Sequence, residues 1–272
     1  MNVKVLGPLE VWHNGISVVP TARKPRQVLS LLAICAGQLV TVTSLIEELW
    51  GIADAPRSAT QLVQTYILRL RQLIDDAMLE GGGGSAKQIL ITRPGGYTLD
   101  IAPEDVDVHR FQKFAQAGER AMEAGDHKSA SNLLGAALET WRGPTLVDVR
   151  VGARLAVEVE RLEQSRLGVQ ESRIDADLRL GRHHQLLGEL AELTALYPLH
   201  EKLCQQYMTA LYACGCKWKA LEIFRRLRQR LVDELGIEPS VQVQHIQRAI
   251  LNSDVDLEAA TMRKPASVGA AG

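Results

Sequence analysis

The sequence predicts an α+β domain followed by an all-α domain. Strand-like alternation and helical periods are mixed in the first hundred residues, whereas the later residues show helical periods with a recurring glycine. The 272 residues exceed the length of one typical domain, so we expect domains over 1–102 and 103–252, then a disordered tail over 253–272. The formal net charge of −1 is ordinary for a globular chain, so bulk charge neither favours nor excludes nucleic acid.

The chain begins with short runs that are typical of strands. The segments VKVLG, LEVWHNG and ISVVP alternate apolar and polar residues and are separated by turn signals. Asn14-Gly15 is the dipeptide that favours a tight two-residue hairpin. These features predict a small antiparallel sheet.

Three helices are expected next. In TARKPRQVLSLLAICAG the apolar period changes to that of a helix, with Pro25 in the first turn and Gly37 at the end. TVTSLIEELWG predicts a shorter helix that Gly51 stops. SATQLVQTYILRLRQLIDD predicts a third helix whose inward stripe comprises Val63, Tyr66, Ile67, Leu70 and Ile74.

The other face of the third helix lacks acidic residues. No aspartate or glutamate occurs between Asp54 and Asp75, and the same is true from Val11 to Ile46. Glutamine, threonine and arginine supply the donors that phosphates and base edges accept, whereas carboxylates near a phosphate backbone are repelled. A solvated amphipathic helix is the alternative interpretation of this face.

The segment QILITRPGGYTLD predicts a β-hairpin, with the turn at Gly95 and Gly96 and with Arg93 near the tip. A phosphate-binding P-loop is excluded because no lysine and no helix follow the glycines at the required spacing. A starting sheet, three helices and a hairpin in this order make a winged helix, in which the third helix enters the major groove.

The second half carries degenerate helical repeats. GDHKSA begins at Gly125, GRHHQL at Gly181 and GCKWKA at Gly215, and a small or apolar residue follows each glycine by five positions. Gly181 and Gly215 are one tetratricopeptide period of 34 residues apart, and Pro198 falls where such a repeat ends. We expect stacked helix pairs that bind partners, with a plain helical bundle as the alternative.

No pattern in the sequence predicts an active site or a cofactor. His183 and His184 are adjacent, so on a helix they cannot share one metal face. A zinc site formed by His200 and the three later cysteines is disfavoured, since the cysteine pair is spaced too tightly for a zinc knuckle. Acidic pairs such as Glu47-Glu48 are expected on the solvated surface. Without a leader or a long apolar run, we expect a cytoplasmic protein with no membrane segment.

Several segments of the sequence resemble a known protein family. LVQTYILRLRQLI followed by ITRPGGYTL resembles the recognition helix and wing of OmpR-type winged helices. VLGPLEVWHNG and ELWGIADAP are similar to the version found in Streptomyces antibiotic regulatory proteins, and DVHRFQKFAQAG, LETWRGPTLVDV and later segments resemble their bacterial transcriptional activation domain. The resemblance covers about residues 3–251.

This resemblance implies a pathway-specific activator of an antibiotic or secondary-metabolite gene cluster. Such proteins bind direct repeats near the −35 element of promoters, usually as two protomers side by side. They recruit RNA polymerase holoenzyme through the sigma factor and other subunits. The alternative is a tetratricopeptide-type interaction scaffold whose winged helix does not bind DNA.

Roles in DNA binding follow for individual residues. We expect four residues of the third helix to face the major groove, namely Gln61, Gln64, Thr65 and Arg69. Contacts to phosphate are expected from Arg23, Lys24 and Arg71. Arg93, carried by the turn at Gly95 and Gly96, should reach the minor groove or its phosphates. Leu68 could pack on a thymine methyl or on a neighbouring protomer.

Overall fold

The computed structural model describes residues 1–79 and 84–252. It divides into two compact units, the first comprising Met1–Ala117 with Leu133–Val169 and the second Gly118–Asn132 with the chain from Gln170 on. The divisions fall inside helices rather than near residue 102, so the boundary at 102/103 stays a prediction. The tail predicted over 253–272 lies outside the described residues.

The first unit opens with an antiparallel sheet of the strands β1 (Asn2–Lys4), β2 (Glu10–His13) and β3 (Ile16–Ser17). The β2–β3 turn has φ of 49° at Asn14 and 80° at Gly15, as a two-residue hairpin turn of type I′ requires. The predicted N-terminal sheet and its hairpin are therefore confirmed.

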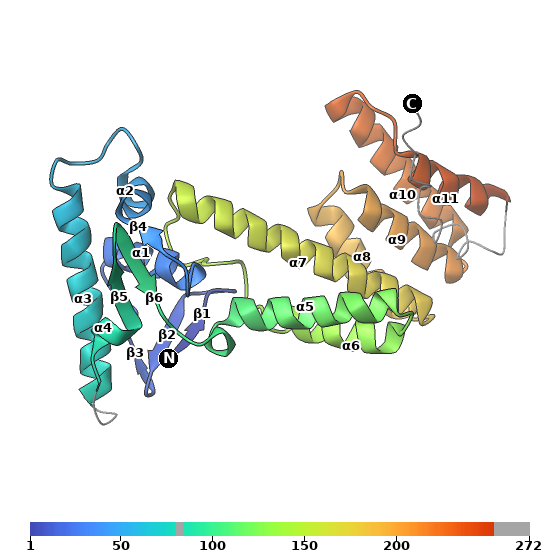
Figure 1. Ribbon diagram of the computed structural model, residues 1–272. Coiled ribbons are helices and arrows are strands. Elements are labelled where there is room, and N and C mark those ends of the chain that lie inside the picture. The colour runs from blue at the N-terminus through green and yellow to red at the C-terminus, as the bar shows by residue number, and fades with distance from the viewer. Residues whose placement is uncertain (80–83, 253–272) are drawn as a thin grey trace, which may run out of the picture. The chain divides into compact units, whose positions relative to one another are not determined.

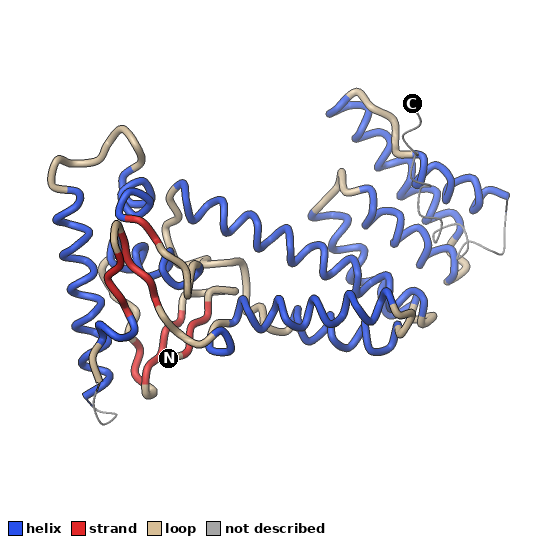
Figure 2. The backbone as a smooth tube through the Cα atoms, in the orientation of Figure 1, coloured by secondary structure: helices blue, strands red, loops and turns tan. Residues whose placement is uncertain are grey.

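Three helices and a second sheet follow, as Figure 1 shows. The helices α1 (Arg23–Ile34), α2 (Val42–Trp50) and α3 (Ala59–Leu79) pack against one another. After the short helix α4 (Ala86–Ile89), strands β5 (Leu90–Arg93) and β6 (Gly96–Leu99) form the predicted hairpin. The two-residue strand β4 (Val40–Thr41), which the sequence did not predict, pairs with β6 and completes the sheet drawn in Figure 2.

The first unit also includes chain that follows the winged helix. It takes in the 3₁₀ turn Pro103–Asp105, parts of α5 (Asp107–Glu123) and α6 (His127–Leu138), and the start of α7 (Ala153–Arg179). The Asp107 carboxylate, which is 1% exposed, accepts hydrogen bonds from Val5 N and Leu6 N, each at 2.9 Å. Burial raises the pKa of Asp107, and these N–H groups oppose that shift.

In the described residues of the second unit, all regular secondary structure is helical, and short turns link the helices. Helices α8 (His183–Leu196), α9 (Glu201–Ala213) and α10 (Lys217–Arg230) pack in sequence, and a π turn (Leu231–Leu235) leads to α11 (Val241–Asn252). Their shared core includes Met208, Phe224 and Ile246.

The three predicted repeat glycines all lie between paired helices. Gly125, Gly181 and Gly215 have φ of 77°, 73° and 78°, the left-handed region that glycine adopts at helix ends without a penalty. The residues five positions later, Ala130, Leu186 and Ala220, are buried. The expected glycine turns between consecutive helices are therefore confirmed, and α9 packs against α10 across one of them; stacking of all the pairs stays a prediction. No described helix is long and apolar enough to cross a membrane.

Candidate nucleic-acid interface

The predicted recognition helix α3 has one buried face and one exposed face. Val63, Ile67, Leu70 and Ile74 are at most 2% exposed and pack inward. The exposed face presents the polar residues Gln61, Gln64, Thr65, Arg69 and Gln72, and with them Leu68, which is 57% exposed. The helical period thus sorts these side chains as predicted, except that Tyr66 of the predicted inward stripe is half-buried and stacks on Trp50, with the ring centroids 6.5 Å apart.

The polar side chains on this face are mostly uncommitted. The Thr65 hydroxyl donates to the Gln61 carbonyl at 2.9 Å, a bond within the helix. Within the described parts of the chain, no side-chain hydrogen bond or ion pair engages Gln64 or Arg69. Their donors and acceptors are therefore available to a ligand.

The β5–β6 hairpin carries Arg93 at its exposed end. Arg93 pairs with Gly96 across a two-residue turn, and Gly95 in that turn has a φ of 78°. Gly95 therefore supplies the turn, as predicted. Gly96 has a different role from the predicted one, because a Cβ there would lie 2.2 Å from the Val40 carbonyl oxygen. Its missing side chain lets β4 approach β6.

Arg71 joins α3 to the hairpin. Its Nε and Nη2 donate to the Leu90 carbonyl at 3.1 and 2.6 Å, and Nη2 also donates to the Thr92 hydroxyl at 2.8 Å. These bonds fix the hairpin beside α3. A phosphate contact by Arg71 stays a prediction. It would have to use the guanidinium N–H groups that do not donate to Leu90 or Thr92.

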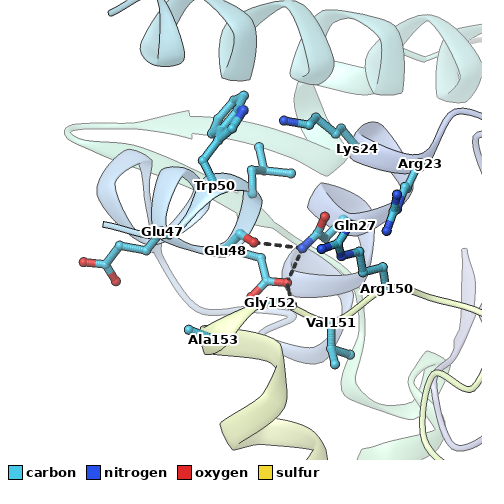
Figure 3. Close-up of a pocket in the computed structure, with 12 residues that line it drawn as sticks. Arg23, Lys24, Gln27, Glu47, Glu48, Trp50, Arg150, Val151, Gly152 and Ala153 are labelled. Atoms are coloured by element: carbon cyan, nitrogen blue, oxygen red, sulfur yellow. Dashed lines mark hydrogen bonds between the residues drawn. The ribbon is translucent and has the colours of Figure 1, made fainter. Parts of the chain in front are cut away.

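Arg23 and Lys24 lie at the N-terminus of α1, beside a hollow of about 340 Å³ (Figure 3). Lys24 Nζ sits 4.0 Å from the centroid of the Trp50 ring, a cation–π geometry. Burial lowers the pKa of Lys24, and the charges of Arg150 and Arg23 lower it further. Arg150, which also lines the hollow, was not predicted from the sequence because it lies far along the chain.

Glu48 corrects the expectation that the Glu47-Glu48 pair is solvated. It is 2% exposed, and its carboxylate accepts hydrogen bonds from Gly152 N at 2.6 Å and Leu155 N at 2.8 Å. Gln27 Nε2 donates to the same carboxylate at 2.7 Å. Glu48 therefore caps the N-terminus of α7, which begins at Ala153, and holds α2 against it.

Among the described residues, no three or more His, Cys, Asp or Glu side chains lie close enough together to hold a metal ion. His200 faces a carboxylate instead, with its Nε2 3.0 Å from Glu171 Oε1. Cys204 is buried, and burial raises the pKa of its thiol to about 11.

A winged helix whose third helix presents an exposed polar face, followed by a helical region, is the fold of a class of transcription regulators. The chain matches the family models of the bacterial transcriptional activator domain over residues 106–251 and of the C-terminal transcriptional regulatory protein domain over residues 17–99. It therefore belongs to the bacterial transcriptional activator domain family, as a regulator of the small Streptomyces antibiotic regulatory protein type.

Known regulatory proteins are similar to this chain over nearly its whole length. Regulatory protein DnrI of Streptomyces peucetius is 49% identical over 100% of this chain and 99% of its own length. Transcriptional regulator RedD of Streptomyces coelicolor is 34% identical over 97% of this chain and 75% of its own. Regulatory protein AfsR of the same species is 36% identical over 94% of this chain, which corresponds to 25% of AfsR.

A solved structure shares the fold. Mycobacterium tuberculosis EmbR, in complex with a low affinity phosphopeptide, superposes with a TM-score of 0.85 and 31% sequence identity. The match covers 96% of this chain and 68% of the EmbR chain. The predicted fold class, an α+β winged helix followed by an all-α region, is therefore confirmed.

Proposed function

We propose that this protein is a sequence-specific DNA-binding transcriptional activator whose helix α3 enters the major groove. The observation that carries this proposal is the exposed face of α3, where no carboxylate intervenes and the described residues form no side-chain hydrogen bond or ion pair with Gln64 or Arg69. Glutamine can pair bidentately with adenine and arginine with guanine, so this face has the chemistry to read base edges.

Other residues position the helix on the duplex. In this proposal Arg93 reaches the minor groove or its flanking phosphates from the exposed hairpin end, and Arg71 keeps the hairpin at its place beside α3. Arg23 and Lys24 contact phosphates at the N-terminus of α1, where the helix dipole also favours an anion.

The kind of target follows from the family. We propose that two protomers bind direct repeats near the −35 element of promoters in an antibiotic or secondary-metabolite gene cluster. Residues 103–252 then support protomer contacts and recruit RNA polymerase holoenzyme, including its sigma factor, in the cytoplasm. The names of DnrI and RedD as regulatory proteins, and the match to the activator domain family, support this assignment.

A band shift on a double-stranded promoter fragment at several salt concentrations tests the proposal. We expect affinity to fall steeply with salt, because binding releases counterions from the phosphates. An interaction scaffold with a non-DNA-binding winged helix would show no salt-sensitive shift.

The variant Arg69→Ala tests the role of α3 in sequence recognition. It should lose about 1–3 kcal/mol on the preferred sequence and relax discrimination at one base position. Arg120→Ala, which removes an exposed arginine from α5, is the matched control and should bind like the wild type. An equal loss by Arg69→Ala on all sequences would reassign Arg69 to a phosphate contact.

A further inference from the structure

The hollow at the N-terminus of α1 brings together cations from distant parts of the sequence. Arg23 and Lys24 come from α1, and Arg150 comes from the loop before α7. Figure 3 shows the Arg23 and Arg150 side chains close together beside Gln27, with Lys24 directed toward Trp50. Over the range that the structure describes, none of the three cations forms an ion pair with a carboxylate.

The two carboxylates that line this hollow are already engaged. Glu47 pairs with Arg154 at 2.6 Å, and Glu48 accepts its three hydrogen bonds from Gly152, Leu155 and Gln27. Neither neutralises the three cations. The charge on this side of the hollow is thus positive and unbalanced.

The backbone at the same place also favours an anion. Ala22, the N-cap of α1, offers no side-chain acceptor, and the first turn contains no acidic residue. In the described residues no side chain caps the N–H groups of Arg23 and Lys24, Pro25 has no N–H, and the helix dipole adds a positive potential. Burial lowers the pKa of Lys24, and the nearby charges of Arg150 and Arg23 lower it further, so the three cations repel one another.

We propose that Arg23, Lys24 and Arg150 bind a phosphate group in this hollow, with the indole of Trp50 as one wall. Arginine matches phosphate oxygens with its planar fork, and lysine supplies a point charge. The volume of about 340 Å³ accommodates a phosphate with part of the group that carries it. Arg150 lies within residues 106–251, so the activator domain region contributes to this site.

The phosphate can come from two sources. One is the backbone of bound duplex DNA, and this version rests on the proposed function. The other is a small soluble phosphorylated compound, and it does not depend on DNA binding. The same variants distinguish the two sources.

Arg150→Gln in the full-length chain removes one of the three cations, and Arg23→Gln, at an exposed position, is a second variant should the first fold poorly. Arg161→Gln is the matched control, because it removes an exposed α7 arginine that does not line the hollow. Thermal unfolding checks that all three variants keep the wild-type fold.

Two readouts are compared. The first is titration with inorganic phosphate at constant ionic strength, followed by NMR shifts of the amide groups of Arg23 and Lys24. The second is the slope of the logarithm of duplex affinity against the logarithm of salt concentration. A duplex source predicts that Arg150→Gln reduces the magnitude of this slope by about 0.9 and weakens binding equally on preferred and scrambled sequences.

A soluble source predicts saturable phosphate shifts in the wild type that Arg150→Gln abolishes, with an unchanged slope. If Arg150→Gln and Arg161→Gln match the wild type in both readouts, the phosphate site is refuted. If the wild type binds no duplex at all, the proposed function fails, and the phosphate titration alone then decides this inference.

Discussion

Replacing Glu48 should destabilise the first unit far more than replacing its neighbour Glu47. Glu48→Ala removes the acceptor for Leu155 N, Gly152 N and Gln27 Nε2, and the bonds from Leu155 N and Gln27 Nε2 are buried. Each buried donor left without a partner costs about 1–3 kcal/mol. Water can reach the half-buried Gly152, so we expect a total loss of about 3–5 kcal/mol rather than the full sum.

Glu47→Ala is the control because it removes the same charge one residue earlier. Its partner Arg154 has a side chain that is 54% exposed, so the pair is a surface ion pair worth about 0–1 kcal/mol. The two variants differ mainly in whether buried donors lose their acceptor.

Urea unfolding monitored by tryptophan fluorescence measures the difference. Trp12, Trp50 and Trp141 lie in the first unit and Trp218 in the second, so a Trp218→Phe background makes the signal report on the first unit alone. Equal midpoints for Glu48→Ala and Glu47→Ala would refute the role of Glu48 as the cap of α7.

Three further results are expected. Gly95→Ala should lower the free energy of unfolding by about 1 kcal/mol through backbone strain. Gly96→Ala should lower it by about 3 kcal/mol because β4 has to move. Similar urea midpoints for the two variants would contradict the different roles of these glycines. Folding of the first unit as a whole predicts well-dispersed NMR signals for the fragment 1–169 and broad signals for 1–102. A well-dispersed 1–102 would instead favour the boundary at 102/103 that the sequence predicts. Partial burial raises the pKa of the half-buried Cys35 thiol to about 11, so its thiolate fraction at pH 8 should fall about 100-fold below that of the unfolded chain. Its alkylation rate by iodoacetamide, followed by mass spectrometry, should fall likewise; equal rates would contradict the raised pKa.

The sequence predicted the features that depend on local spacing. Gly181 and Gly215 mark helix ends because a left-handed backbone favours glycine regardless of what surrounds it. The sorting of Gln64 outward and Ile67 inward on α3 follows from the helical period alone. Such patterns are read within a few residues, so they need no knowledge of the tertiary fold.

Features that depend on distant partners could not be predicted. Glu48 is a buried cap only because α7 begins next to it, and Arg150 joins the hollow only because its loop returns to α1. Strand β4 is two residues long, and its pairing with β6 requires the close approach at Gly96. Spacing along the chain carries no signal for these contacts, since each depends on tertiary packing.

Footprinting of the purified protein on the promoters adjacent to its own gene tests the central claim most directly. We expect protection of direct repeats, with major-groove contacts that are lost in Arg69→Ala and kept in Arg120→Ala. Absence of any protected repeat, at protein concentrations where the wild type is folded, would contradict the assignment of α3 as a DNA-reading helix.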